Sequence, residues 1–253
     1  RKPANPSRGA AMGWLASALA VPAAGCASGA DQSEGHPLAA VGTCRCGLVD
    51  VHSHYLPPSY ADALARAGLV TLDGGFPVPK WSEEMALSHM DRHNIETSML
   101  SVSSPTVGFL KDAYSRARLA REVNVFAADL VKRKPQRFGA FATLPLPDVK
   151  SSLDEIGYAL DVLKLDGVVM ETNVHGIYLG EARLDPLFAQ LNRRRTALFL
   201  HPPSPPCLDA VGLGRPAPIL EFPMDTARTV TDLIFAGTLV RYLDIRMVTP
   251  HAG

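Results

Sequence analysis

Two histidines one residue apart, His52 and His54, follow the short apolar run Leu48 to Val51. Such a run is typical of a buried strand, and residues i and i+2 of a strand point to the same side. We therefore expect the two imidazoles to aim at one point from the end of this strand. Neutral imidazole is the commonest protein ligand for metals such as zinc. The pattern predicts that these two histidines are two of the ligands of a metal site. The alternative is that both have a structural role and bind no metal.

Two further histidines come at the ends of apolar runs. His201 ends the run 197–201, and His251 follows the run 245–249. If both runs are strands of one parallel barrel sheet, their carboxyl ends share a face with the end of 48–51. Three of the four histidines would then supply nitrogen ligands to a metal ion, while the fourth acts as a base or supports a ligand.

The elements that would position these histidines alternate along the chain. Apolar runs typical of strands are separated by amphipathic stretches typical of helices. The expected strands cover 48–51, 95–102, 137–144, 167–171, 197–201 and 245–249, and the expected helices cover 60–67, 82–94, 112–134, 149–164, 184–195 and 222–240. This alternation predicts an α/β protein with a parallel sheet.

Two architectures fit such a series of strands and helices. One is the (β/α)8 TIM-like barrel of the metal-dependent hydrolase type, which typically needs about 250 residues. The other is an open doubly wound sheet. The four histidines favour the barrel, because all of its strands end on the one face where catalytic groups gather. Since only six strands are expected, we predict a barrel that is truncated after strand six.

The first 46 residues differ in character from the rest. Three basic residues precede an apolar, Ala-rich run at 10–25, which Cys26 follows. This layout is typical of a secretory or lipoprotein signal, and a disordered Ala/Gly-rich tail is the alternative. We therefore expect a leader or disordered segment at 1–46 and a barrel at 47–253 that is incomplete at its C-terminus. Two locations therefore stay open: the cytoplasm, or export if residues 1–26 are a signal or lipoprotein leader.

The composition excludes several classes of function. Lys and Arg number 25, as do Asp and Glu, so the formal net charge is zero. This balance gives no electrostatic footprint for a nucleic acid. No apolar run of about 20 residues occurs after the leader, so we expect no membrane span there. The four cysteines are too few for a disulfide scaffold of this size and are expected to be structural or incidental.

Seven motifs after the leader resemble those of one known family. They are D-V-H-S-H-Y-L-P-P (50–58), L-S-V-S-S-P (100–105), R-F-G-A-F-A-T-L-P (137–145), D-G-V-V-M-E-T-N (166–173), L-F-L-H-P-P (198–203), F-P-M-D-T-A-R-T (222–229) and H-A-G (251–253). Through them the chain resembles the amidohydrolase-related superfamily, in its branch of aminocarboxymuconate-semialdehyde decarboxylase-like enzymes. The resemblance implies a distorted (β/α)8 barrel that holds one divalent metal ion, zinc first and manganese as the alternative.

The resemblance also implies roles for the four histidines. His52, His54 and His201 correspond to the metal ligands of the family, and His251 to the catalytic histidine that polarises water or substrate. The family uses a further aspartate from strand eight, and this strand is expected to lie beyond the end of the sequence. Met170 to Asn173, at the end of the fourth expected strand, contain no lysine of the kind that binuclear members carry. A single metal ion is therefore expected.

Three other residues are candidates for contact with substrate. Trp81 could stack on an aromatic ring, His175 follows the fourth strand, and Arg228 could pair with a carboxylate. A structural role is the alternative for each. With one metal ion, such a site would decarboxylate an aromatic acid of the hydroxybenzoate type or a related unsaturated carboxylic acid.

Two other functions remain open beside the decarboxylase. A metal ion can lower the pKa of a bound water to about 7, so a hydrolase of amides or lactones is the main alternative. A non-catalytic metal-binding protein is the third hypothesis. A small-molecule carboxylic acid is the expected partner, and because family members are often dimers, the resemblance implies a homodimer.

Overall fold

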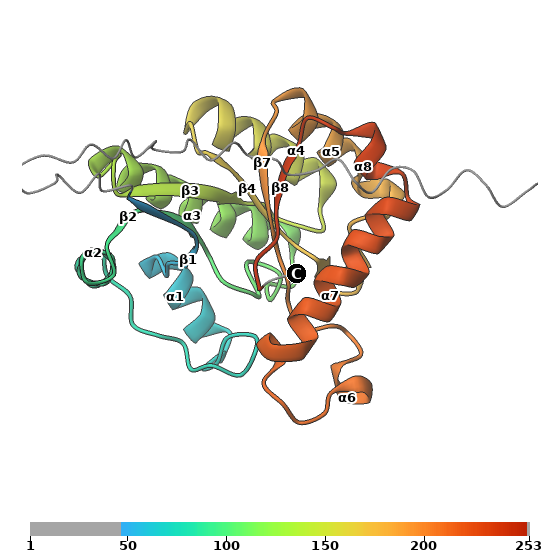
Figure 1. Ribbon diagram of the computed structural model, residues 1–253, viewed down its shortest axis with the longest axis horizontal. Coiled ribbons are helices and arrows are strands. Elements are labelled where there is room, and N and C mark those ends of the chain that lie inside the picture. The colour runs from blue at the N-terminus through green and yellow to red at the C-terminus, as the bar shows by residue number, and fades with distance from the viewer. Residues whose placement is uncertain (1–46, 252–253) are drawn as a thin grey trace, which may run out of the picture. The chain divides into compact units, whose positions relative to one another are not determined.

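The structure is a computed structural model that describes residues 47–251. Its centre is a sheet of six parallel strands in the order β1-β2-β3-β4-β7-β8. The sheet curls strongly, so that β3 and β8 run in clearly different directions (Figure 1). The strands are β1 Leu48–His54, β2 Ile95–Ser101, β3 Phe138–Thr143, β4 Gly167–Glu171, β7 Ala197–His201 and β8 Arg246–Val248.

Helices connect successive strands of the sheet. They are α1 Pro58–Arg66, α2 Glu83–Arg92, α3 Ala113–Arg133, α4 Val149–Gly157, α5 Asp185–Arg193, α6 Leu208–Val211, α7 Ala217–Phe235 and α8 Thr238–Arg241. A π-helical turn, η1 Tyr158–Val162, continues α4, and a 3-10 turn, η2 Ala182–Leu184, precedes α5. The strands β5 Asn173–Val174 and β6 Ile177–Tyr178 form a small hairpin after β4.

Local sequence explains where several of these helices begin. Ser82, Asp112 and Asp148 are the N-caps of α2, α3 and α4, and each side chain accepts a hydrogen bond from a backbone N–H of the first turn. Such caps satisfy donors that the helix itself leaves free. These three helices therefore begin where the sequence predicts them.

The strand order distinguishes the two expected architectures. In the described sheet, the strands lie side by side in the order in which they occur along the chain. The hairpin strands β5 and β6 form a separate sheet. A doubly wound sheet would reverse its order at a switch point, whereas a (β/α)8 barrel adds its strands in chain order. The predicted α/β fold is confirmed: the six strands form a curled half-barrel of this type. Within residues 47–251 no strand pairs with the outer edge of β1 or of β8.

Two sequence predictions are wrong in detail. The run Leu48 to Val51 is not buried: Leu48 is 60% and Val49 58% exposed, because β1 is an edge strand of the described sheet. The helix expected at 222–240 begins earlier, at Ala217, and ends at Phe235. Gly237 at φ +70° then separates α7 from the short α8, because this left-handed backbone does not continue a helix.

Residues on the two faces of the sheet pack differently. Alternate residues of the central strands face the helices and form the large hydrophobic core. On the opposite, inner face Phe141, Val169 and Phe199 form a small second cluster. The rings of Phe141 and Phe199 stack with centroids 5.2 Å apart. Since His201 lies two residues after Phe199 on the same strand, this cluster forms the apolar floor below it.

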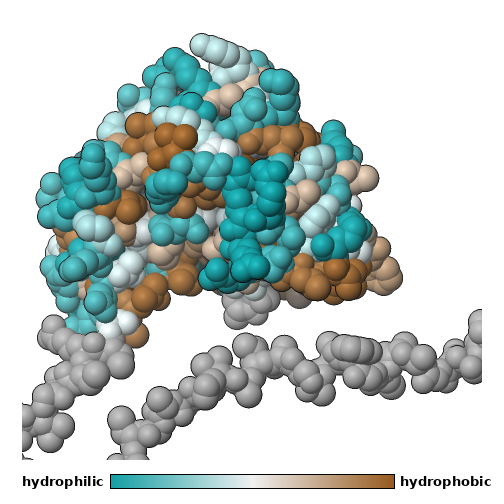
Figure 2. All heavy atoms as spheres, turned by 90° about the horizontal axis from the view of Figure 1, so that it is seen from above, coloured by the Kyte–Doolittle hydropathy of each residue, from teal (hydrophilic) through white to brown (hydrophobic). Residues whose placement is uncertain are grey.

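The surface mixes polar and apolar side chains. Figure 2 shows one face on which hydrophobic patches interrupt a largely hydrophilic surface. In the part of the chain that the structure describes, no helix is both long and apolar enough to cross a membrane. The leader expected at 1–46, with Cys26, Cys44 and Cys46, lies outside the described residues.

Candidate metal centre

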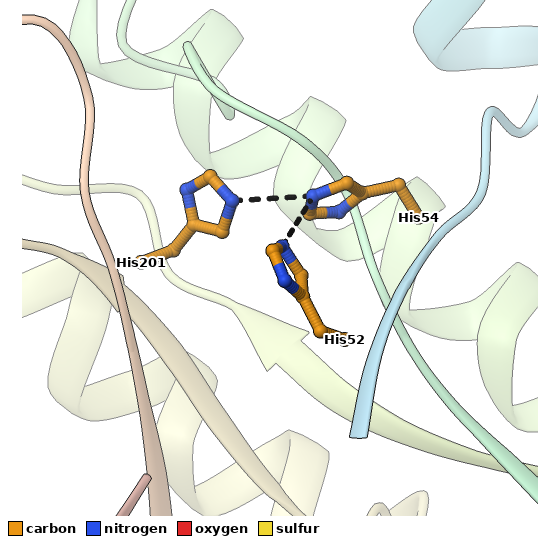
Figure 3. A group of neighbouring side chains, drawn as sticks. All are labelled: His52, His54 and His201. Atoms are coloured by element: carbon orange, nitrogen blue, oxygen red, sulfur yellow. Dashed lines mark hydrogen bonds between the residues drawn. The ribbon is translucent and has the colours of Figure 1, made fainter. Parts of the chain in front are cut away.

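Three histidines converge at the carboxyl ends of β1 and β7. The Nε2 atom of His54 lies 3.1 Å from Nε2 of His52 and 3.2 Å from Nε2 of His201. Figure 3 shows the three rings pointing toward one another. One nitrogen from each ring belongs to a set in which all atoms lie within 4.8 Å of one another. The side-chain alternation expected of β1 therefore places His52 and His54 together, with His201 beside them.

The spacing and orientation of these nitrogens fit a metal ion. Two nitrogens about 2.1 Å from a shared tetrahedral metal stand about 3.4 Å apart, close to the spacing found here. The Nδ1 atom of His54 lies 3.2 Å from the carbonyl oxygen of Ser101. The hydroxyl of Ser101 lies 3.3 Å from the same nitrogen. When Nδ1 donates its proton to the carbonyl, which can only accept, Nε2 presents a lone pair to the cluster.

His251 joins the same cluster from the end of β8. Its ring centroid lies 4.8 Å from that of His52 and 5.8 Å from that of His201. On its other side it contacts Phe222 of α7, at 5.4 Å between centroids. Its Nε2 atom is buried without a hydrogen-bond partner among the described residues. The structure thus brings together all four histidines that the sequence placed at strand ends.

Burial keeps these imidazoles neutral. It lowers the pKa of His52 and of His54 to about 4, helped at His52 by the neighbouring histidines and at His54 by His251. The pKa values of His201 and His251 are also lowered, again chiefly by burial. A metal binds the neutral imidazole, so at neutral pH these side chains are already in the form that a metal requires.

The lowered pKa values predict that the metal-free protein loses stability in acid. An unfolded histidine titrates near pH 6.5, whereas His52 and His54 stay neutral in the folded protein down to about pH 4. Between these values the unfolded chain binds more protons, so the free energy of unfolding falls as the pH falls. Each such proton changes it by at most about 1.4 kcal/mol per pH unit.

Urea unfolding in the presence of a chelator, at about pH 7 and about pH 5, measures this effect. Burial raises the pKa of Glu171 to about 7, which acts in the opposite direction because its stabilisation is lost as the pH rises. The wild type is therefore compared with the variant His54→Asn. The free energy of unfolding of this variant should fall less between about pH 7 and about pH 5. An equal fall in stability in the variant and the wild type would contradict the prediction.

The three candidate substrate residues lie in different surroundings. Trp81 packs against the core, with its ring centroid 6.0 Å from that of Tyr55. His175 follows β5 with φ +54°, and its Nε2 donates to the carbonyl oxygen of Gly108 at 2.8 Å. Arg228 of α7 pairs with Asp225 at 2.8 Å. Of the three, His175 lines a cavity at the same edge of the sheet as the histidines.

Sequence reasoning missed Glu171, the last residue of β4. It pairs in register with His201 of β7, so both side chains share the inner face of the sheet. Glu171 is 4% exposed, and its Oε1 atom is buried without a partner among the described residues. The signal was present: Glu171 ends an apolar strand two residues after Val169, which faces the inner cluster.

A second missed group surrounds the buried Asp225 of α7. Its carboxylate accepts hydrogen bonds from Asn173 at 2.8 Å, from Tyr178 at 2.6 Å and from the hydroxyl of Thr172. The ion pair with Arg228 completes the group. These bonds fasten α7 to the segment after β4, one turn away from Phe222 and its contact with His251.

We expect Asp225→Ala to destabilise the protein by about 3 kcal/mol, because it leaves buried donors without an acceptor. Asp209→Ala is the matched control, since Asp209 is exposed on α6 and its loss should change stability by less than about 0.5 kcal/mol. Urea unfolding of both variants gives the comparison. Similar stabilities for the two would show that the buried group does not fasten α7.

Comparisons with known proteins agree with the fold. Residues 49–253 match the Amidohydrolase family. Decarboxylase yanB of Aspergillus niger is 38% identical over 216 residues, which cover 81% of this chain and 58% of that protein. The 6-methylsalicylic acid decarboxylase acuB of Aspergillus aculeatus is 36% identical over 208 residues, covering 81% and 62%. The chain thus spans about three fifths of the length of these curated relatives.

Solved structures share the same fold. A crystal structure described as an amidohydrolase II superposes with a TM-score of 0.75 at 33% identity, covering 79% of this chain and 65% of that one. A dihydroxybenzoic acid decarboxylase from Polaromonas sp. JS666, with bound manganese and an inhibitor, superposes with a TM-score of 0.67 at 23% identity, covering 80% and 64%. Half-barrel, histidine cluster and sequence match together define a member of the amidohydrolase superfamily. The chain belongs to the Amidohydrolase family.

Proposed function

We propose that the protein is a metal-dependent, non-oxidative decarboxylase of an aromatic acid related to 6-methylsalicylate or another hydroxybenzoate. In this proposal His52, His54 and His201 hold one divalent metal ion, and His251 is the catalytic residue. The observation that carries it is the convergence of three neutral imidazoles at the end of the sheet, of which His201 is buried and the other two are half-buried. The decarboxylase relatives support the reaction, and the orphaned Nε2 atom of His251 supports its role toward substrate.

The identity of the metal is part of the proposal. Three imidazole ligands suit zinc, which is our first choice. Manganese is the alternative, supported by the bound manganese of the Polaromonas decarboxylase with the same fold. Held by these residues, the metal would supply a Lewis acid for the oxygens of the substrate.

The residues of the chain have separate tasks in this reaction. The ring carbon that carries the carboxylate gains one proton, drawn ultimately from solvent water. The bond between this carbon and the carboxylate then breaks, which releases CO₂ and restores aromaticity. His251 offers its unpartnered Nε2 to a substrate oxygen in the neutral form that its lowered pKa favours. Phe199 and Phe222, which contact these histidines, exclude water from the site. Trp81, His175 and Arg228 remain candidates for contact with substrate, with His175 supported by its place in the cavity.

The product of the reaction tests the proposal. Purified protein loaded with zinc or with manganese is incubated with 6-methylsalicylate and, separately, with aryl amides and lactones. Release of CO₂ with formation of the phenol is the expected result. A hydrolysed amide or lactone without CO₂ would favour the hydrolase instead, and binding of metal without either product would favour a metal-binding protein. Light scattering of the same sample tests the homodimer that we also propose.

A further inference from the structure

A cavity of about 260 Å³ lies beside the histidine cluster. The segments that follow β2, β4 and β7 form it, so it opens at the carboxyl edge of the sheet where His201 lies. Its residues are Ser104, Pro105, Gly108, Phe109, Glu171, Asn173, Val174, His175, Pro203, Ser204 and Pro206. Glu171 joins the cavity to the histidines, because it pairs in register with His201.

The size and the walls of the cavity suit one aromatic ring. A cavity of about 150 Å³ is enough to bind benzene, so the space found here also holds ring substituents. Proline rings, Phe109 and Val174 make most of the wall apolar. A small number of polar groups set among apolar side chains is typical of small-molecule sites.

Acidic groups dominate the charge at one side of the cavity. Glu171 lines it directly. Behind two of its wall residues lies Asp73, which accepts hydrogen bonds from the hydroxyl of Ser104 at 3.1 Å and from that of Ser204 at 2.5 Å. Lys and Arg are absent from the residues that line this cavity in the described chain.

Glu171 also lacks one expected partner. Its Oε2 accepts a hydrogen bond from Thr106 at 3.2 Å, whereas the buried Oε1 has none within the described residues. Buried polar atoms are nearly always hydrogen-bonded. An occupant of the cavity with an uncharged polar group or a hydrogen-bond donor would therefore complement this side. A second carboxylate would lose its hydration there without a cationic partner, and above the pKa of about 7 that burial gives Glu171 it would also meet like charge.

We propose that this cavity receives the substrate ring and that Glu171 is a specificity-determining residue which excludes a second anionic group from it. This inference rests on the proposed function, because it assumes that the reacting carboxylate lies at the histidines. The expected substrates are aromatic acids with one carboxylate. Their substituents on the side of the ring that faces Glu171 are uncharged. Dicarboxylic acids of the same size are poor substrates.

Binding of two matched phenols tests the inference without any chemical step. Isothermal titration calorimetry on the metal-loaded protein, at about pH 8.5, compares 3-methyl-2-nitrophenol with 3-hydroxy-2-nitrobenzoate, in which a carboxylate replaces the methyl group. In both compounds a nitro group stands in for the reacting carboxylate. The wild type is expected to bind 3-methyl-2-nitrophenol about 100-fold more tightly. Glu171→Gln, which keeps the shape but removes the acid, should narrow this ratio at least about tenfold. Glu181→Gln, an exposed residue paired with Arg183, is the matched control and should leave the ratio unchanged.

A second variant guards against a Glu171→Gln protein that does not fold. Pro206 is exposed at the cavity, so Pro206→Phe should block it and weaken the binding of 3-methyl-2-nitrophenol about tenfold or more. Equal affinity for the two phenols, an unchanged ratio in Glu171→Gln, or full binding in Pro206→Phe would each overturn the inference. Failure of the proposed function is distinct: the binding ratio would persist while 6-methylsalicylate releases no CO₂.

Discussion

The double variant His52→Ala/His54→Ala should bind almost no metal. Elemental analysis of the wild type, dialysed after loading, is expected to give roughly one equivalent of zinc or manganese. The variant should retain less than about a tenth of this, because a site left with one imidazole has lost most of its ligands. Decarboxylation of 6-methylsalicylate should fall by about 10³-fold or more, since the Lewis acid is lost with the metal.

The chain offers a matched control on its surface. His89 and His93 lie close together on and after α2, with ring centroids 4.4 Å apart, and both are exposed. The variant His89→Ala/His93→Ala therefore removes the same two side chains without touching β1. Metal content and activity should stay at the level of the wild type. If the control lost the metal and the β1 variant kept it, the centre would have been placed wrongly.

The two outcomes differ for a physical reason. The exposed pair retains access to water, whereas His52 and His54 meet His201 where burial lowers the pKa of all three. The Nε2 atom of His54 lies 3.1 Å from that of His52 and 3.2 Å from that of His201, and the buried Nε2 of His251 beside them has no partner among the described residues. Burying such a polar cluster is costly without a partner, and a metal ion supplies that partner.

Much of this site could be predicted from the sequence because it depends on local periodicity. The i, i+2 spacing alone placed His52 beside His54. The positions of His201 and His251 after apolar runs placed them at strand ends, and the parallel sheet then brought the ends together. The prediction needed no knowledge of which residues pack against which helix.

Other features could not be predicted because they depend on contacts between distant segments. The exposure of Leu48 and Val49 is set by which strands pair with β1, and the apolar run itself does not show this. Asp73 reaches Ser204 across 131 residues of the chain, and Asp225 reaches Asn173 across 52. Asp73 lies in a Gly/Pro-rich loop. The local sequence there predicts a turn, and it does not predict hydrogen bonds to a distant loop.

His251→Asn should separate metal binding from catalysis. Asparagine is chosen because His251 has φ +60°, a backbone conformation that asparagine tolerates better than most residues. We expect kcat for 6-methylsalicylate to fall by about 10²- to 10⁴-fold, the usual contribution of a group that positions or transfers a proton. The metal content should remain that of the wild type, because the three ligands on β1 and β7 are unchanged.

The metal content of His251→Asn decides between two roles that the geometry alone allows. The ring of His251 lies as close to that of His52 as the ring of His54 does, with both centroid distances at 4.8 Å. If the variant loses metal in proportion to activity, His251 is a fourth ligand rather than the residue that acts on substrate. If activity falls while metal remains, its orphaned Nε2 serves the substrate, and burial against Phe222 is what keeps that imidazole neutral for the task.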